Sequence, residues 1–311
     1  MAKTYLVTGA AGFIGAQLAG QLIKDGHKVV TIDNLSTGYV NTIPQGVIFI
    51  EGDCQASMVI ESLKEYSFDA IFHIAGQSSG EVSFDHPVYD LQTNTQSTLL
   101  LLRYCIETGC KKLVYASTMS VYGDQEFLPV NEASPNVPKS LYGVGKLASE
   151  HYLRIFSEFG IATAAVRLFN VYGPGQNLKN MRQGMVSIYI AQVLSQNAIH
   201  VKGSPDRFRD FVYIDDVVNA FITIEKQMQF NSFLLFNVCS GRKITVGELV
   251  DLIRRGFGTD IPANYEGSTT GDQFGIFGSH ALLTNATGWQ PAVSLEDGLV
   301  RMIDWAKNTE R

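Results

Sequence analysis

Thr8-Gly9-Ala10-Ala11-Gly12-Phe13-Ile14-Gly15 is the stretch that decides the fold of this 311-residue chain. It follows residues 4–7, which predict a short strand, and it opens a segment whose apolar residues recur at helical spacing. Glycines at these positions permit a tight turn, close approach of a pyrophosphate to the backbone, and close packing of helix on strand. Because the helix N-terminus then faces the phosphates, we expect a βαβ unit that binds a dinucleotide.

Asp33 follows a second predicted strand, residues 28–32, and stands about twenty residues beyond the glycines, where a carboxylate can bond the ribose hydroxyls of the adenosine. The same carboxylate would repel a ribose 2′-phosphate, and no arginine comes directly after it. We therefore predict NAD rather than NADP as the dinucleotide.

Short β-rich runs alternate with helical patterns through the first half, which predicts parallel strands joined by right-handed crossovers. The predicted strands are residues 4–7, 28–32, 47–50, 70–74, 112–116 and 163–168. Beyond about residue 170, loops at 171–184, 202–209 and 263–278 separate helices predicted at 185–195, 215–225, 246–255 and 295–307. We predict an α/β fold with a Rossmann-type doubly wound parallel sheet in residues 1–169. Residues 170–311 are expected to form a smaller α/β lobe, mainly substrate-binding, with some segments returning to the first domain.

Composition and charge exclude several classes of protein. Hydrophobic residues make up 45% and charged residues 17% of the chain, which is typical of a compact globular enzyme. The net charge of −6 comes without a block of like charges, so we expect no nucleic-acid binding, and bound phosphates must be held by local groups. No cysteine spacing suits a metal, and no apolar run approaches the roughly eighteen residues of a membrane span. We expect a cytoplasmic protein with reduced thiols, no metal site and no membrane association.

Tyr142 and Lys146 stand four residues apart in YGVGK, at the start of a predicted helix, and this spacing places a phenol and an ammonium on one helix face. We expect the ammonium and the helix N-terminus to favour the phenolate and so to lower the pKa of Tyr142. The strand at 112–116 runs into Ser117 and Thr118, whose hydroxyls should lie at the C-terminal edge of the parallel sheet, where ligands of such folds bind. The glycine turn, these hydroxyls and YGVGK therefore converge on one cleft.

Together these motifs resemble those of the extended short-chain dehydrogenase/reductases, and in particular the NAD-dependent nucleotide-sugar epimerases related to UDP-galactose 4-epimerase. The resemblance extends over nearly the whole chain. Its motifs are TGAAGFIG, DNLSTG at 33–38, GD at 52–53, HIAG at 73–76, ASTMSVYG, YGVGK, RLFNVYGPG at 167–175 and RDFVYIDDVV at 209–218. It implies an enzyme that passes hydride from C4 of a UDP-hexose or UDP-N-acetylhexosamine to NAD. The hydride then returns to the other face of the 4-keto sugar.

The resemblance also implies roles for individual residues. Tyr142 corresponds to the acid/base, Lys146 to the residue that holds the nicotinamide ribose, and Thr118 to the hydroxyl that shares the substrate proton. The residues implied to bind the cofactor are Gly9, Gly12, Phe13, Ile14, Gly15, Asp33, Asn34, Ser36, Thr37, Gly38, Asp53, Cys54, Ala75, Gly76, Gln77, Asn94, Ser117, Tyr142 and Lys146. Those implied to bind the nucleotide sugar are Ser79, Thr118, Asn170, Arg209 and Asp272. Helices at 87–108 and 140–159 correspond to those that pair in a homodimer.

The sequence departs from the family pattern beside the catalytic Thr and late in the second half. Dehydratases of the same fold follow the catalytic Thr with acidic residues, whereas Met119 and Ser120 stand here, so a 4,6-dehydratase is disfavoured. An Arg that often stands two residues before a late Gly-Asp is replaced by Thr269. One diphosphate anchor is therefore missing or is supplied elsewhere, by Arg182 or Arg207.

Three further positions bear on ligand recognition. Ser78 stands where some relatives place a Lys near the cofactor phosphates, and no Asn-Leu pair for the nucleotide is evident around residues 184–186. Ile276 stands where some relatives have a Tyr that narrows the sugar pocket, so it either admits an N-acetyl group or is ordinary packing. His73, at the end of a predicted strand, is expected to be a core residue.

Two other functions share part of this pattern. A reductase or dehydrogenase that makes one net hydride transfer carries the same motifs. A noncatalytic NAD-binding protein would need the phosphate loop but not Thr118, Tyr142 and Lys146, and the joint presence of these three residues argues against it.

Overall fold

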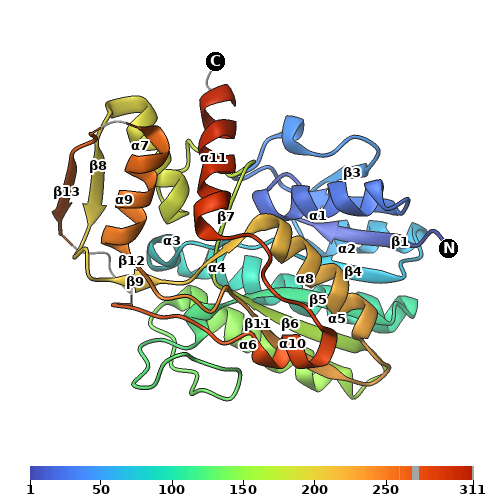
Figure 1. Ribbon diagram of the computed structural model, residues 1–311. Coiled ribbons are helices and arrows are strands. Elements are labelled where there is room, and N and C mark those ends of the chain that lie inside the picture. The colour runs from blue at the N-terminus through green and yellow to red at the C-terminus, as the bar shows by residue number, and fades with distance from the viewer. Residues whose placement is uncertain (259, 268–272, 310–311) are drawn as a thin grey trace.

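A seven-stranded sheet, in which every pairing is parallel, forms the centre of the molecule (Figure 1). The computed structural model describes residues 1–258, 260–267 and 273–309. The strands of the sheet are β1 (Thr4–Thr8), β2 (Lys28–Asp33), β3 (Ile48–Glu51), β4 (Ala70–His73), β5 (Lys112–Thr118), β6 (Ala162–Leu168) and β11 (Phe233–Val238). Their order, β11-β6-β5-β4-β1-β2-β3, is that of a doubly wound dinucleotide-binding fold with one added edge strand. The predicted fold class is confirmed.

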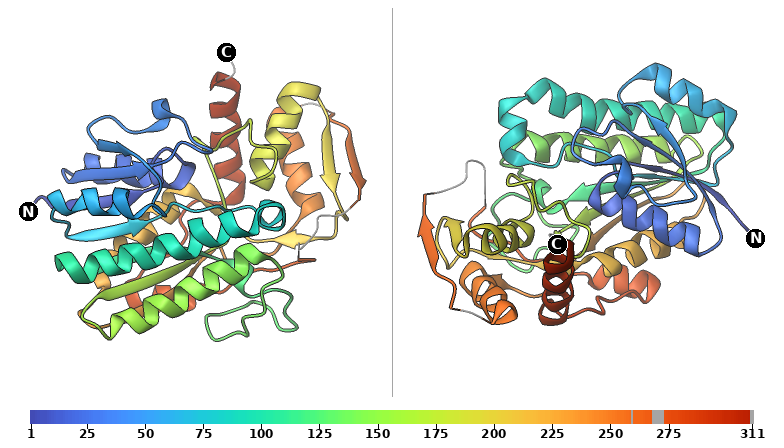
Figure 2. Two further views of the ribbon diagram at one scale, coloured as in Figure 1. Left: turned by 180° about the vertical axis from the view of Figure 1, so that it is seen from behind. Right: turned by 90° about the horizontal axis from the view of Figure 1, so that it is seen from above.

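Helices cover both faces of the sheet (Figure 2). One face carries α1 (Phe13–Lys24), α8 (Ile214–Gln227) and α10 (Ala281–Thr287), and the other carries α2 (Ser57–Ser62), α5 (Ser97–Thr108) and α6 (Leu141–Ser157). This double cover explains why the central strands are apolar along their whole length instead of alternating with polar residues. Every residue of β6, for example, is buried.

The six predicted strands are all present, with bounds that differ by one or two residues. The segment of the second half that returns to the sheet is β11, which pairs with β6. Its sequence, FLLFNV, is a short apolar run with neither a helical nor an alternating period. The local sequence therefore does not indicate which sheet this strand joins.

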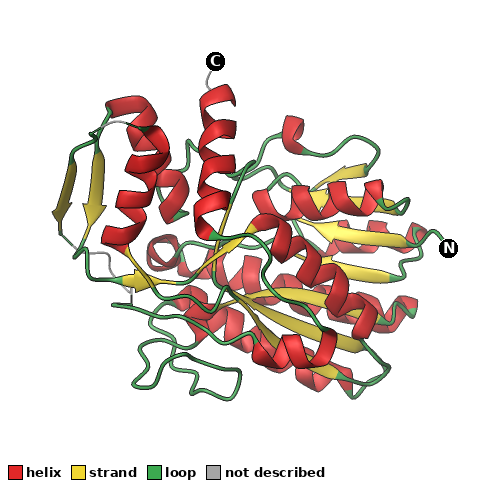
Figure 3. Ribbon diagram, in the orientation of Figure 1, coloured by secondary structure: helices red, strands yellow, loops and turns green. Residues whose placement is uncertain are grey.

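Apart from β11 and the helices α8 and α10, which pack on the sheet, most of the second half forms a smaller lobe beside the C-terminal ends of the strands (Figure 3). Its described residues contain α7 (Met185–Gln196), α9 (Val246–Phe257) and three strand pairs, with α11 (Leu295–Thr309) packed against both helices. The pairs are β7 (Asn170–Tyr172) with β10 (Phe211–Tyr213), β8 (Ile199–Lys202) with β13 (Ala263–Glu266), and β9 (Phe208–Arg209) with β12 (Ile244–Thr245). The segments predicted as loops contain several of these strands, which are too short to show a period in the sequence.

A series of helices on the face of the sheet that carries α5 leads to the cavity described below. It begins with α3 (Gly80–Asp85) and α4 (Pro87–Leu91) and passes through π-helical residues Gln92–Gln96 into α5. The helix predicted at 87–108 is thus continuous but changes its pitch. Across the described residues, each helix is either too short or too polar to cross a membrane.

Candidate active site

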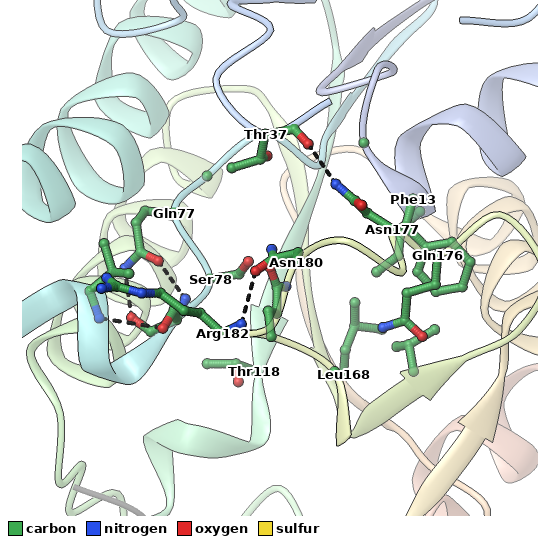
Figure 4. A pocket seen from close by; sticks show the side chains of 18 of the residues that line it. Phe13, Thr37, Gln77, Ser78, Thr118, Leu168, Gln176, Asn177, Asn180 and Arg182 are labelled. Carbon is green, nitrogen blue, oxygen red and sulfur yellow. Dashed lines mark hydrogen bonds between the residues drawn. The ribbon is translucent and has the colours of Figure 1, made fainter. Parts of the chain in front are cut away.

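A cavity of about 1590 Å³ lies between the C-terminal ends of the sheet strands and the smaller lobe (Figure 4). We call the cavity-lining residues between Gly9 and Thr93 the glycine wall, and Lys202, Arg207 and Arg209 the cationic wall. The residues that line the glycine wall include carboxylates but no Lys, Arg or His.

The glycine turn packs so closely that it has no room for side chains. Gly9 has a φ of +78°, in the left-handed region, and a methyl group on it would lie 2.8 Å from the backbone nitrogen of Ala75. A methyl group on Gly15 would lie 2.1 Å from the carbonyl oxygen of Gly9. Asp33 ties the turn to β2, because its Oδ2 accepts a hydrogen bond from the backbone nitrogen of Ala11 at 2.9 Å. The turn therefore brings the N-terminus of α1 to the cavity with its backbone exposed.

Polar side chains continue this wall beyond the turn. Asn34 Nδ2 donates to Asp53 Oδ2 at 2.7 Å, and Cys54 beside them is buried. The predicted cofactor residues that line the cavity are Gly9, Gly12, Phe13, Ile14, Gly15, Asp33, Asn34, Ser36, Thr37, Gly38, Asp53, Cys54, Ala75, Gly76, Gln77, Ser117, Tyr142 and Lys146. Asn94 lies just behind the surface of the cavity, where it is fully buried.

Asp90 was not among the predicted site residues, yet it organises this region. Its Oδ1 accepts hydrogen bonds from Gln77 Nε2 at 2.7 Å and from Asn94 Nδ2 at 3.0 Å, and burial raises the pKa of its carboxyl. Asn94 Oδ1 is buried and has no hydrogen-bond partner within the described residues, and a methyl group on Gly76 would lie 2.5 Å from it. This oxygen is thus an acceptor without a described partner, beside Gly76, which lines the cavity. The sequence does contain a signal for the Asp90–Asn94 contact: Asp90 stands four residues before Asn94, in a helical segment that also carries apolar residues.

Thr118, Tyr142 and Lys146 meet where β5 ends and α6 begins. Thr118 lies close enough to Tyr142 for its hydroxyl to influence the pKa of the phenol, and its Oγ1 donates to Ser120 Oγ at 3.2 Å. Ser140 caps α6 by accepting a hydrogen bond from the backbone nitrogen of Gly143 at 3.1 Å, which sets Tyr142 in the first turn. Lys146 Nζ donates to the carbonyl oxygen of Ala116 at 2.9 Å. The predicted convergence of these segments is present in the structure.

The expected lowering of the Tyr142 pKa is not what the folded chain produces. Burial raises the pKa of Tyr142 to about 12, and the nearby hydroxyl of Thr118 only partly opposes this. The ammonium of Lys146 lies 5.8 Å from the centre of the phenol ring and bonds the Ala116 carbonyl instead. Burial lowers the pKa of Lys146 itself to about 8, against the charges of Asp90 and Glu150. Desolvation therefore outweighs the i,i+4 attraction on which the expectation rested.

A buried ion pair holds α6 against the sheet just behind these residues. Arg167 Nε and Nη2 donate to Glu150 Oε1 and Oε2 at 2.9 and 2.7 Å, and Ser117 Oγ donates to Glu150 Oε1 at 2.5 Å. Arg167 also stacks over the ring of Tyr122, 4.6 Å from its centre. The network joins β5, α6 and β6, so it fixes the position of Ser117, next to Thr118. Sequence reasoning missed it because its members are far apart along the chain.

The second-lobe residues predicted to bind substrate lie on the opposite side. Asn170 lines the cavity and donates to the carbonyl oxygen of Asp210 at 2.9 Å. Arg209 is buried, and its guanidinium donates to backbone carbonyls, including that of Gln273 at 2.7 Å. Ser79, the N-cap of α3, lines the cavity from the first half. Asp272 lies outside the described residues, as does Thr269.

The loop that follows β7 crosses the mouth of the cavity and touches the first half. Asn177 Nδ2 donates to the carbonyl oxygen of Thr37 at 3.3 Å, as Figure 4 shows. Arg182, farther along the loop, forms an exposed ion pair of 3.4 Å with Asp85. Met185 and Val186 continue the lining at the start of α7.

Three other positions singled out in the sequence have clear surroundings. Ile276 is buried in a small apolar cluster with Tyr122 and Phe169 and does not line the cavity, so it is ordinary packing. Ser78 lines the cavity, so its side chain can face a ligand. His73 is a buried core residue: its Nδ1 bonds Thr8 Oγ1 at 2.9 Å, and burial lowers its pKa to about 3.

Comparisons with known proteins agree with this geometry. The family model "NAD dependent epimerase/dehydratase family" matches residues 5–239. A Thermotoga maritima UDP-glucose 4-epimerase, solved with UDP-glucose, is 33% identical, covers 99% of this chain and 100% of its own, and superposes with a TM-score of 0.95. A Thermus thermophilus UDP-glucose 4-epimerase in complex with NAD is 30% identical, covers 98% and 99%, and has a TM-score of 0.91. The Mycolicibacterium smegmatis UDP-glucose 4-epimerase is 31% identical over 97% of this chain and 98% of its own.

Proposed function

This chain belongs to the NAD dependent epimerase/dehydratase family, and from that premise we propose that it is a nucleotide-sugar 4-epimerase acting on a UDP-hexose or UDP-N-acetylhexosamine. The observation that carries the proposal is the meeting of Thr118, Tyr142 and Lys146 at the C-terminal edge of the sheet, inside a cavity with two unlike walls. Met119 and Ser120 follow Thr118, so the acid that a dehydratase uses to eliminate water is not at that place.

NAD is the cofactor of the family, and the residues of the glycine wall fit it. The glycine turn lines the cavity at the N-terminus of α1, where backbone N–H groups can bind a pyrophosphate. Asn94 Oδ1 offers a buried acceptor next to Gly76, where a ligand donor such as an amide can satisfy it. NAD, when bound, supplies the hydride acceptor and a positively charged ring.

We infer the following roles for the residues of the chain. Thr118 and Tyr142 hold the C4 hydroxyl of the sugar between them, and Tyr142 takes up its proton and later returns it. A neutral phenol cannot accept a proton, and burial keeps Tyr142 neutral, so its phenolate needs a nearby positive charge. Protonated Lys146, 5.8 Å from the phenol ring, provides one from the chain itself. Closure of the loop around Asn177 over the cavity would keep the keto sugar from leaving.

We also propose that residues 1–169 mainly hold the cofactor and residues 170–311 mainly hold the substrate, with β11 returning to the first domain. A homodimer through α5 and α6 is supported by the apolar side chains that these helices expose, including Ile106, Val144 and Ile155. A cytoplasmic location is supported by four free, buried cysteines. Light scattering on the purified protein tests the dimer.

A panel of UDP-, GDP-, CDP- and dTDP-sugars tests the proposed reaction, with products resolved by NMR. We expect inversion at C4 of a UDP-sugar, NAD that stays bound through purification, and no net absorbance change from NADH. A stoichiometric gain of NADH would instead indicate a dehydrogenase, and loss of a C6 hydroxyl would indicate a 4,6-dehydratase. Either result would overturn the proposal.

A further inference from the structure

Two arginines enter the cavity from one side of a short strand. Side chains along an extended strand point alternately to opposite faces. Phe208 points away from the cavity centre, with its ring packed against those of Phe274 and Phe277. Arg207, directly before Phe208, and Arg209, directly after it, both line the cavity. Two guanidinium groups therefore share one stretch of wall.

Bringing two guanidinium groups into a partly buried wall carries a desolvation cost. Arg209 is buried, and burial together with the like charge of Arg207 lowers its pKa to about 10. Burial also lowers the pKa of Arg207, which is partly buried. Lys202 lines the same wall and pairs with Glu81 at 3.7 Å, although the whole chain carries a net charge of −6. Cations gathered in a partly dry cavity favour a ligand that brings more than one negative charge.

Arg207 is held in a defined position. Its Nη1 donates to the carbonyl oxygen of Lys202, and its own carbonyl oxygen accepts from the backbone nitrogen of Val246 at 2.7 Å. Gly203 has a φ of +105°, and a methyl group on it would lie 2.7 Å from Arg207 Nη1 and 3.1 Å from Arg207 Cδ. The glycine therefore leaves room for this side chain. A guanidinium positioned in advance loses little entropy when it binds an anion.

We propose that Arg207 is a second anchor for the diphosphate of the nucleotide sugar, beside Arg209, and so determines substrate affinity rather than the chemical step. The inference rests on the proposed function and deepens it. A hexose carries its diphosphate on C1, across the ring from C4. With C4 at Thr118 and Tyr142, the diphosphate must lie away from these residues, on the side of the smaller lobe that forms the cationic wall.

Arg182, the other arginine considered as a second diphosphate anchor, lines the same cavity but at the end where the sugar reacts. Figure 4 shows it in the part that also holds Gln77, Ser78 and Thr118. Its guanidinium pairs with Asp85, and its side chain is 62% exposed, so solvent screens its charge. A cation there faces the reacting end of the sugar and not its diphosphate.

Calorimetric titration of the NAD-loaded protein with UDP, UMP and uridine tests the proposal. Replacing Arg207 by Ala should weaken UDP binding about 10- to 100-fold, since a charge-assisted hydrogen bond contributes roughly 1.5–3 kcal/mol. Uridine, which has no phosphate, should bind as tightly as it does to the wild type. Arg207→Lys should recover part of the loss, because it restores the charge but not the planar fork. With UDP-sugar as substrate, KM should rise while kcat stays within about twofold.

Arg242→Ala is the matched control, since it removes a half-exposed arginine outside the cavity that pairs with a carboxylate. It should leave UDP affinity within about twofold. UDP binding by the Arg207→Ala protein that equals wild type would overturn the inference, and so would an equal loss of uridine affinity, which would indicate a merely structural role. If Arg207→Ala fails to fold, Arg207→Gln and Arg207→Lys carry the same test, with NAD affinity as the check of folding. A wild-type protein that binds no UDP would instead contradict the proposed function.

Discussion

The glycine wall and the cationic wall line the same cavity, but they can bind phosphate through different kinds of group. The glycine wall offers backbone N–H groups at the start of α1 and contains no cation among its described residues. The cationic wall offers the side chains of Arg207 and Arg209, at a cost in like-charge repulsion. Backbone donors belong to a local turn and do not depend on pH, whereas cations must be brought together by the fold. The difference explains how a net-acidic chain can hold two diphosphates in one cleft.

Loss of the Tyr142 phenol should have the largest effect on turnover. We expect Tyr142→Phe to lower kcat about 10³-fold or more, because general acid–base catalysis contributes roughly 10²–10⁴-fold. NAD and UDP affinities should stay near those of the wild type, since neither wall changes. Tyr265→Phe, which removes an exposed phenol outside the cavity, is the control and should retain activity. Full turnover by Tyr142→Phe would refute its assignment as the acid/base.

Loss of the buried ion pair behind the catalytic residues should have the second-largest effect. Glu150→Gln leaves the buried guanidinium of Arg167 without its countercharge, so we expect the free energy of unfolding to fall by about 3–5 kcal/mol. Glu296→Gln, which breaks the half-exposed pair with Arg242, should lower it by at most about 1 kcal/mol. Denaturant unfolding with several probes measures both. Similar losses for the two variants would show that the buried pair has no special role.

Gly15→Ala should break the glycine wall and leave the cationic wall intact. The new methyl group meets the carbonyl oxygen of Gly9 at 2.1 Å, and that backbone atom can move only by opening the turn. We expect NAD affinity to fall about tenfold or more, a loss of roughly 1.4 kcal/mol, with UDP affinity changed much less. Gly20→Ala in the same helix is the control, since its methyl group would lie 3.6 Å from the nearest atom, Pro44 Cγ, and alanine favours a helix. Equal losses of NAD and UDP affinity would mean that the walls are not independent.

The smallest expected effect is a shift of the pH profile through Asp90. The pKa of Lys146 is about 8, so kcat should fall as pH rises through that value and the ammonium loses its proton. The negative charge of Asp90 raises this pKa against burial. Asp90→Asn removes that charge, and the alkaline limb of the kcat profile should therefore move to lower pH. Asp25→Asn, at the end of α1, should leave the limb in place. An unmoved limb in Asp90→Asn would show that Asp90 does not act through Lys146.

The parts of the fold that the sequence predicted are those that depend on neighbours along the chain. The six strands, the glycine turn and the placement of Tyr142 and Lys146 on one helix all follow from residues a few positions apart. β11 was not identified as a sheet strand, because an apolar run of six residues packs equally well in several places. Asp90 and the Glu150–Arg167 pair were missed for a related reason: a charged residue in a sequence looks exposed until its partners are known.

By itself, the sequence determined the family, the cofactor and the order of the chemical groups along the chain, because these are written in short motifs whose geometry is local. Only the tertiary structure decided the electrostatics of the site. It raised the pKa of Tyr142 by burial where the motif predicted a lower value, and it placed Ile276 in packing rather than in the sugar pocket. It also brought Arg207 and Arg209 to one stretch of the cavity wall. The physical reason is that desolvation and charge interactions depend on every group that the fold brings near, whatever its distance in sequence.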